Sequence, residues 1–562
     1  MSDVRAGAAR PGAPSAAEPA IQAFLDDLLA DNPVLATGLG LTASAGRLPS
    51  WSAEAVARRI GMLRRHERTL LPLLRDKEVA TAVDAFAGLQ IARRQLRDLE
   101  LRRVQHRCPG AYLDVLSGLF PLLARELGSP AERVEALAGR LGATPGLLEE
   151  ARVNLEPGLP LALVRAGLDQ VDGLLDLAGP TACAFAASAG QEGALDRASQ
   201  TACAALAAFR RHLHDGLLPG AAVECGAGRL VLEDILRWEH VLDDAPEELA
   251  RYGREVLAAT KDDMEEVAAR LGHGDAASAV AALQADHPAA DDLVAAYRRA
   301  VMAARAHVAA RDIVSLPPGE ELAVMATPTF LRSLLPFAAY DPPGPYDARQ
   351  LGFYYVTPPR DGLPAAEREA ALRSHPRASL ATTGVHEAYP GHHLQLVSAN
   401  RATTLARRIA HIPSGGNILV EGWAFYCEEL MEQQGLLADP AARLMRLNDQ
   451  VWRACRVVID VELHLGVMDL PAAVNYLCAE AHMNRYEAEL ECRRYASEPG
   501  QAMSYLLGKR EVQRLAALYE RRRGGSLRDF HDRLLSWGCL PPAVIAWGMG
   551  LAPPPAAARL SS

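Results

Sequence analysis

The chain has 562 residues, more than one small hydrophobic core usually organises, so its length predicts two subdomains. Apolar residues make up 49% and charged residues 23%, and the net charge of -10 gives no electrostatic reason to bind nucleic acid. The N-terminus is rich in Ala, Gly, Pro and Ser without a signal-peptide apolar run, and no stretch of about 18 apolar residues predicts a membrane span. We therefore expect a disordered leader over residues 1–17, a cytoplasmic location and no membrane partner.

Nine cysteines are spread thinly along the chain, and none forms a Cys-x-x-Cys pair. This pattern predicts reduced, mostly buried thiols. Cys427 lies six residues after Glu421 and so lies near a candidate site, but we favour core packing for it. The sequence does not indicate an oligomeric state.

Residues 18–313 are expected to form a helical subdomain. Their apolar positions recur at helical spacing, most clearly over 83–103 and 292–314. Proline-containing breaks predict the connections between helices, and they lie at Asn32-Pro33, Ser129-Pro130, Glu156-Pro157-Gly158 and His287-Pro288. No fixed-period repeat is evident.

Residues 314–562 are expected to form a second, metallohydrolase subdomain. Short β-prone runs with dense Pro and Gly over 314–360 predict a small sheet or extended lip, whose edge strand would pair with an extended substrate. Tyr355 in this segment is a candidate substrate-binding residue. One long helix is then predicted through 386–395, followed by helices over 421–435, 450–466 and 471–496. The expected fold is mainly α, a large helical array with this sheet before the metal-binding helix, forming a cleft.

The segment HEAYPGHHLQ (386–395) is the most informative feature of the chain. It places three imidazoles and one carboxylate within eight positions. Zinc takes about four ligands from His, Cys, Asp and Glu, and a catalytic zinc keeps one position for water beside a carboxylate base. The cluster therefore favours a metal site over histidines that merely decorate a helix end.

The spacing differs from HExxH, in which two histidines four residues apart share one helix face. Position 390 is proline, and the next histidines, His392 and His393, follow His386 by six and seven residues. On a straight helix, six steps turn the second ring about 120° away, and seven steps separate the rings by about 10 Å. Pro390-Gly391 would bend or bulge a helix, and a bulge would bring His392 to the ligand position. The residues alone leave open whether His392 or His393 is the second ligand.

Glu421 is the candidate third ligand. It lies 35 residues after His386, follows a turn over Pro413–Asn417 and begins a predicted helix. A carboxylate in a first turn is also common without any metal, because it interacts favourably with the helix dipole. Glu428 lies seven residues later on the same face, where we expect a surface charge rather than a partner of a ligand.

Three segments, HEAYPGHHLQ, EGWAFYCEEL (421–430) and RYASEPGQAMSYLLGK (494–509), resemble in order and spacing the domain of unknown function family 885. Further similarity covers LGFYYVTPP before the cluster, with VVIDVELHLG and FHDRLLSWGCLPPAVI after it, and extends weakly to the N-terminus. The resemblance implies a zinc metallopeptidase related to the thermolysin-like enzymes that use two histidines and a glutamate, the gluzincins. Many relatives begin with a secretion or lipoprotein signal, from which this chain departs.

Position by position, the resemblance implies His386, His392 and Glu421 as metal ligands in an HExxxxH pattern, with Glu387 as general base. His393 would then be a substrate-facing or supporting residue. The cofactor would be one Zn²⁺ per chain, and manganese, cobalt or iron would suit the same ligands.

Amide hydrolysis also needs donors for the oxyanion and for a substrate carboxylate. Tyr495 and Tyr505 are catalytic candidates for the first role. Arg494 and Lys509 are candidates for the second, and Gln501 follows the Pro499-Gly500 turn beside them. Asp460 and His464, spaced i,i+4, are expected to form a structural pair.

The expected function is zinc-dependent cleavage of peptide bonds, with oligopeptides favoured over folded proteins. The sequence leaves two alternative functions open. The same site would serve a hydrolase of a non-peptide amide or ester, such as a secondary-metabolite conjugate, or the chain would be a catalytically inactive binding module. An intact Glu387 argues against the second.

Overall fold

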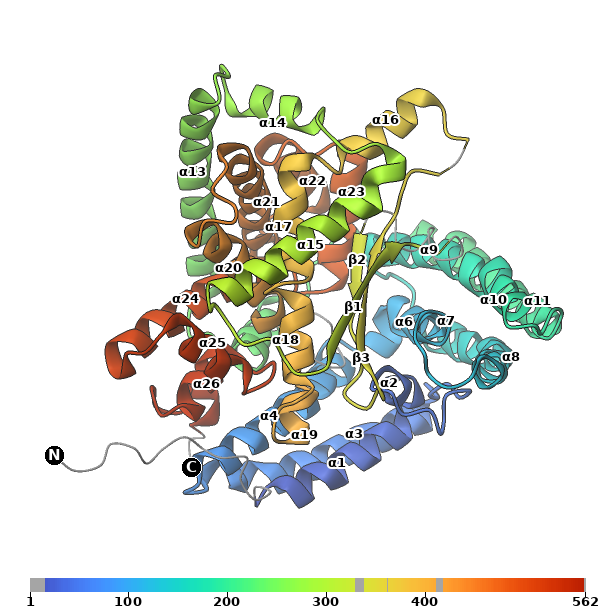
Figure 1. Ribbon diagram of the computed structural model, residues 1–562. Helices are drawn as coiled ribbons and strands as arrows, with labels where there is room; N and C mark the ends of the chain where they lie inside the picture. The colour runs from blue at the N-terminus through green and yellow to red at the C-terminus, as the bar shows by residue number, and fades with distance from the viewer. Residues whose placement is uncertain (1–15, 329–337, 361, 411–417, 560–562) are drawn as a thin grey trace.

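The computed structural model describes residues 16–328, 338–360, 362–410 and 418–559. It confirms a mainly helical fold that contains one small sheet (Figure 1). The predicted leader over 1–17, apart from its last two residues, and the predicted turn over Pro413–Asn417 lie outside the described residues.

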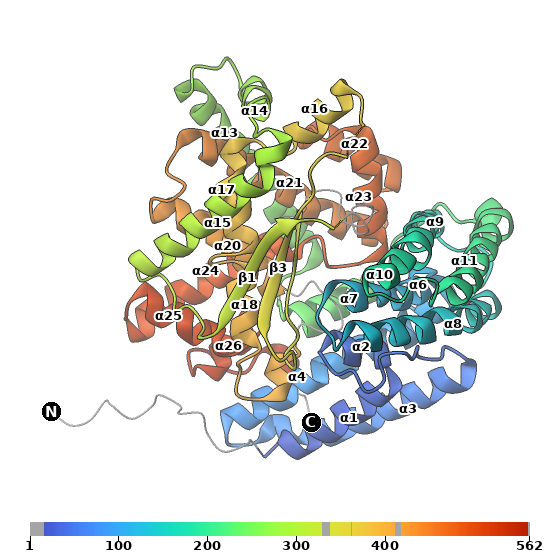
Figure 2. The ribbon, with the colours of Figure 1, turned by 45° about the vertical axis from the view of Figure 1, so that its right-hand side comes forward.

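The first part of the chain is helical, as its apolar spacing predicts. Its helices are α1 (Glu18–Asp31), α2 (Pro33–Gly38), α3 (Ala53–Leu70), α4 (Val79–Leu96), α5 (Val104–Arg107), α6 (Gly110–Ser117), α7 (Leu119–Ala124), α8 (Pro130–Asn154), α9 (Leu161–Asp176), α10 (Ala182–Ser188), α11 (Asp196–Arg211) and α12 (Arg229–Asp234). Helices α1, α3 and α4 pack together at one end of the molecule, and α6 to α11 form a layer beside the sheet (Figures 1 and 2).

The predicted breaks are confirmed as helix boundaries. The Asn32 side chain accepts a hydrogen bond from the Leu35 amide and begins α2, and Pro33 follows it at the first helical position, where no amide is needed. Ser129 and Glu132 form a reciprocal capping box at the start of α8.

The middle of the chain supplies three helices and the sheet: α13 (Pro246–Arg270), α14 (Ala276–Gln284), α15 (Leu293–Ala310), β1 (Glu320–Ala326), β2 (Ala338–Asp341) and β3 (Gln350–Val356). The strand order is β1-β3-β2, with β1 parallel and β2 antiparallel to the central strand. Helix α15 packs along β1 and β3, and Figure 2 shows it beside the sheet. The predicted small sheet is therefore confirmed, and the cleft and the pairing of an edge strand with substrate stay predictions.

The C-terminal part is again helical: α16 (Ala365–Arg373), α17 (Arg377–Glu387), α18 (His392–Ala399), α19 (Leu405–Arg408), α20 (Ile418–Gln433), α21 (Pro440–His464), α22 (Leu470–Glu480), α23 (Arg485–Ser497), α24 (Ser504–Arg523), α25 (Leu527–Leu535) and α26 (Pro542–Gly548). The prediction of one long helix through the histidine cluster is wrong. The helix ends at Glu387 and a new one begins at His392, because Pro390 has no amide to continue the hydrogen-bond ladder.

The hydrophobic core mixes both halves of the sequence. One apolar cluster joins α1, α3 and α4 with α15, α17, α20 and the C-terminal helices, and a second joins α13 with α21 and α24. Both clusters contain residues from each side of the predicted boundary at 313 and 314, and the division into two subdomains stays a prediction. All nine cysteines are free thiols, and Cys427 is fully buried in the first cluster, as predicted.

No helix in the ranges that the structure describes is both long enough and apolar enough to cross a membrane.

Helices α20 and α24 pack face to face through two glycines, and both carry candidate site residues. A Cβ atom added to Gly508 would collide with the carbonyl oxygen of Ile418, and one added to Gly422 would collide with the backbone of Gly508. Only glycine therefore allows the two backbones to lie this close.

We predict that Gly508→Ala lowers the free energy of unfolding by about 1–3 kcal/mol or more, because backbone atoms of a buried contact must move apart. Equilibrium denaturation measures this change. The matched control is Gly142→Ala in α8, where an added Cβ meets nothing within 4 Å, so the free energy of unfolding should stay level or rise by up to about 1 kcal/mol. Equal stability of Gly508→Ala and the wild type would contradict this view of the contact.

Candidate metal centre

The break between α17 and α18 is fixed by hydrogen bonds from both sides. The Gly391 amide donates to the Val385 carbonyl at 3.0 Å, and the Trp423 indole on α20 donates to the Pro390 carbonyl at 2.7 Å. A Cβ atom on Gly391 would collide with the carbonyl oxygens of Val385 and His386, so this close return of the chain requires glycine.

The break brings two imidazoles and a carboxylate together. Nε2 of His386 lies 3.9 Å and Nε2 of His392 lies 3.5 Å from Oε2 of Glu421, and the two imidazole rings are nearly perpendicular with centroids 4.7 Å apart. One ligand atom from each of the three residues lies within 4.8 Å of the others. Two ligands about 2.1 Å from a tetrahedral zinc ion lie roughly 3.4 Å apart, so this spacing can hold a metal ion.

The surroundings of the Glu421 carboxylate show whether these residues suit a cation. Its Oε2 atom is buried and accepts no hydrogen bond from the described residues. Burial alone would raise the pKa of this carboxyl, but His392, His386 and Arg456 outweigh it and hold the pKa at about 2. A buried carboxylate oxygen rarely lacks a partner, and a cation between the three side chains would provide one. The residues present therefore fit a metal ion.

Glu428 holds the ring of His386. Its Oε1 atom lies 2.7 Å from Nδ1 of His386, and the side chain is 2% exposed. Burial lowers the pKa of the His386 imidazole, but Glu428, Glu387 and Glu421 outweigh it and raise that pKa. The expectation of a surface charge at Glu428 is therefore wrong. Its position seven residues after Glu421 on one helix face was the signal, and metal-binding histidines usually have such a carboxylate partner on the other ring nitrogen.

Glu387 follows His386 at the C-terminal end of α17 and is half-buried. Its carboxylate makes no hydrogen bond with the described residues, and its charge contributes, after burial, to raising the pKa of Tyr340 and of Tyr354 in the sheet. Glu387 therefore lies next to His386 in the chain, and its carboxylate has no hydrogen-bond partner among the described residues.

The two candidate tyrosines have different surroundings. The Tyr505 ring lies parallel to the His386 ring at 6.4 Å, and burial and then Glu421 raise the pKa of its hydroxyl. Tyr495 is 1% exposed, and its hydroxyl accepts hydrogen bonds from Arg456 at 3.0 Å and Trp452 at 3.1 Å. The structure thus brings Tyr505, rather than Tyr495, into contact with the cluster.

His393 points away from the cluster into a buried polar network. Its Nε2 lies 2.9 Å from Glu320 on β1 and its Nδ1 lies 2.9 Å from the Tyr340 hydroxyl, and the side chain is fully buried. Glu320 also accepts a hydrogen bond from Tyr389 and pairs with Arg305. These contacts attach α18 to the sheet and occupy both ring nitrogens, so they do not favour the predicted substrate contact. Sequence reasoning missed Glu320, which lies 66 residues before the cluster.

The other substrate-binding candidates have partners within the protein. Arg494 donates to Gln501 at 2.8 Å and to Glu491 at 2.7 Å. Lys509 is 5% exposed and pairs with Glu429 and Gln450, and Tyr355 is 2% exposed on the central strand. Their substrate roles stay predictions.

Asp460 and His464 have the expected structural role, because both are fully buried. Asp460 accepts hydrogen bonds from the amides of Gly500 and Met503, at 2.9 and 3.0 Å. These bonds hold the turn that leads into α24, and the second donor, Met503, lies two residues before Tyr505. The ring of His464 lies 3.1 Å from the Tyr495 carbonyl oxygen.

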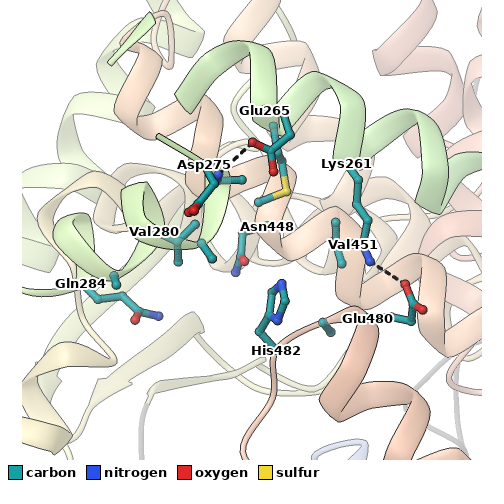
Figure 3. A pocket seen from close by; sticks show the side chains of 14 residues that line it. Lys261, Glu265, Asp275, Val280, Gln284, Asn448, Val451, Glu480 and His482 are labelled. Atoms are coloured by element: carbon teal, nitrogen blue, oxygen red, sulfur yellow. Dashed lines mark hydrogen bonds and ion pairs between the residues drawn. The ribbon is translucent and has the colours of Figure 1, made fainter. Parts of the chain in front are cut away.

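Two cavities lie elsewhere in the fold. One, of about 460 Å³, lies between α13, α14 and α21, where Asn448, Gln284 and His482 surround it (Figure 3). The other, of about 670 Å³, lies between the chain near Thr42 and the start of α8. Neither is lined by His386, His392 or Glu421.

We predict that Glu428→Gln lowers the affinity for zinc about 10- to 100-fold, because His386 loses the charge that orients its ring and raises its basicity. Competition with a chelating dye measures the affinity. Glu429→Gln is the matched control, since it removes a neighbouring carboxylate that pairs with Lys509 instead. An equal loss of affinity in both variants would show that the Glu428 effect is not specific to His386.

Comparison with known proteins agrees with the fold. Two solved structures match over nearly the whole chain, one of a predicted lipoprotein of unknown function from Shewanella oneidensis and one of a predicted lipoprotein from Colwellia psychrerythraea. The first is 23% identical with a TM-score of 0.76, covering 94% of this chain and 98% of its own. The second is 18% identical with a TM-score of 0.78, covering 95% and 99%.

No curated protein matches the chain. The model of the family described as bacterial protein of unknown function (DUF885) matches residues 33–549. The resemblance noted in the sequence is thereby confirmed at the level of the family, and the chain belongs to the DUF885 family.

Proposed function

We propose that the protein is a zinc-dependent hydrolase that cleaves peptide bonds of oligopeptides. One observation carries this proposal: Oε2 of Glu421, a buried atom with no hydrogen bond from the described residues, faces Nε2 of both His386 and His392 at 3.9 and 3.5 Å. Two imidazoles and one carboxylate form a ligand set used by zinc hydrolases that keep one coordination position for water.

When bound, zinc would polarise the scissile carbonyl group and lower the pKa of a water molecule towards neutrality. Glu387 takes a proton from the attacking water and delivers it to the leaving amine nitrogen as the carbon–nitrogen bond breaks. Glu428 contacts Nδ1 of His386, so Nε2 is the nitrogen left for the ion. Tyr505, stacked on His386, offers a hydroxyl to the negative charge that develops on the carbonyl oxygen.

The burial of the cluster supports small substrates. His386 is 8% exposed and Glu421 is 9% exposed, so little of either side chain reaches the surface. A folded protein cannot present a peptide bond at this depth without local unfolding, whereas an extended oligopeptide can.

The two solved relatives are described as predicted lipoproteins, which favours an attachment to the cell envelope for those proteins. These descriptions do not support the cytoplasmic location expected from the sequence. A cytoplasmic location of this chain is thus a proposal that rests on its sequence alone.

We predict that the zinc-loaded protein cleaves members of a panel of dipeptides to decapeptides and leaves intact casein uncut. Glu387→Gln should keep about one zinc per chain and lower kcat about 100- to 10,000-fold, because it removes the base and leaves the ligands in place. Liquid chromatography of the peptide products and elemental analysis of the same samples give the two results.

Rapid cleavage of casein would contradict the size limit. Cleavage of esters or non-peptide amides without any peptide cleavage would shift the assignment to a different hydrolase. Full activity of Glu387→Gln would contradict the role of the base.

A further inference from the structure

Arg453 lies beside the candidate metal centre on the face of α21 that also carries Asp449 and Arg456. Its guanidinium carbon lies 5.6 Å from the centre of the Tyr505 ring and 5.9 Å from that of the Phe425 ring. The Tyr505 ring in turn stacks on His386 at 6.4 Å. Arg453 is therefore separated from a candidate metal ligand by one aromatic ring.

The guanidinium of Arg453 makes no hydrogen bond with the described residues. Its Nε and Nη1 atoms are buried and have no hydrogen-bond partner, although Nη1 forms an ion pair with Asp449, and the side chain is 13% exposed. The nearest carboxylate oxygen, on Asp449, lies 3.7 Å from Nη1, beyond hydrogen-bond length. A guanidinium carries five donors, and leaving them unpaired away from water is costly.

Neighbouring cations are already engaged. Arg456 donates to the Tyr495 hydroxyl and pairs with Glu491 at 3.1 Å. Arg494 pairs with Glu491 and Lys509 pairs with Glu429, and the sequence favoured these two cations for a substrate carboxylate. Among the cations around Tyr505, Arg453 thus has donors to offer to a ligand. A planar guanidinium with free donors matches the two oxygens of a carboxylate.

We infer that Arg453 binds the C-terminal carboxylate of a short peptide, so that the protein acts on free peptide C-termini rather than within long chains. This inference rests on the proposed hydrolase function. The two ring distances place the guanidinium carbon within about 12 Å of the His386 ring. An extended residue spans about 3.3–3.6 Å, so at most one or two residues lie between a carboxylate bound at Arg453 and the scissile bond.

Binding of alanine peptides of two to five residues, each as a free acid and as a C-terminal amide, tests this inference without turnover. The zinc-loaded Glu387→Gln protein is used, and calorimetry gives Kd. We expect the free acid to bind about 10- to 100-fold more tightly than the amide. Adding Arg453→Gln should remove that difference, and adding Arg453→Lys should restore part of it.

The matched control adds Arg446→Gln. Arg446 is a buried arginine seven residues earlier on the same helix, and it pairs with Glu432. This variant should keep the preference for the free acid. Zinc content and circular dichroism verify that each variant is folded. The comparison of free acid with amide in the Glu387→Gln protein, which keeps Arg453, tests the inference even where an Arg453 variant does not fold.

Equal affinity for acid and amide, or a preference for the acid that survives Arg453→Gln, would overturn the inference. Hydrolysis of acids and amides at equal rates by the zinc-loaded wild type would likewise reject the role of Arg453 while leaving the hydrolase function intact. A preference that Arg453→Gln removes, without hydrolysis of any peptide, would reject the hydrolase function and leave the carboxylate site.

Discussion

At Gly391 any side chain would collide with the carbonyl oxygens of Val385 and His386. Because glycine has no side chain, the chain can turn sharply here between α17 and α18. A continuous helix would carry His392 about 120° around the axis from His386. The turn removes that rotation, and the Trp423 indole from α20 secures it by donating to Pro390. Because α20 also carries Glu421, the helix that secures the turn also carries the third candidate ligand.

The surrounding elements keep the cluster in place. Glu428 on α20 holds the ring of His386, and the network from His393 to Glu320 attaches α18 to β1. On the other side, Gly422 and Gly508 let α24 lie against α20, which sets Tyr505 beside His386. The sheet, the break and two helices thus converge on a small volume, where the buried atoms that have no hydrogen bond among the described residues include Oε2 of Glu421, Nδ1 of His392 and Oε2 of Glu428.

Local patterns predict much of this arrangement. Helical spacing, proline breaks and the β-prone run over 314–360 give the fold class and many element boundaries, because these depend on neighbours in sequence. Residue type also indicates His386 and Glu421 as candidate ligands, but it leaves His392 and His393 as alternatives for the second imidazole. Residue type predicts that Pro390-Gly391 bends or bulges a helix but not that the helix ends there, since one sequence does not show which carbonyl a glycine amide will meet. Glu428 and Glu320 depend on tertiary packing: the burial of the first and the pairing of the second with His393 follow from helices and strands meeting in space. The same holds for Arg453, whose lack of hydrogen bonds is visible only once its neighbours are placed.

The most direct test of the account is the metal content of the purified protein by elemental analysis, after zinc reconstitution, with His386→Ala, His392→Ala, His393→Ala and Glu421→Ala beside the wild type. We expect about one zinc per chain in the wild type and in the His393 variant, and loss of zinc in the other three. Loss of zinc in the His393 variant with retention in the His392 variant would contradict the ligand assignment. A wild-type protein that holds no metal would contradict the centre itself.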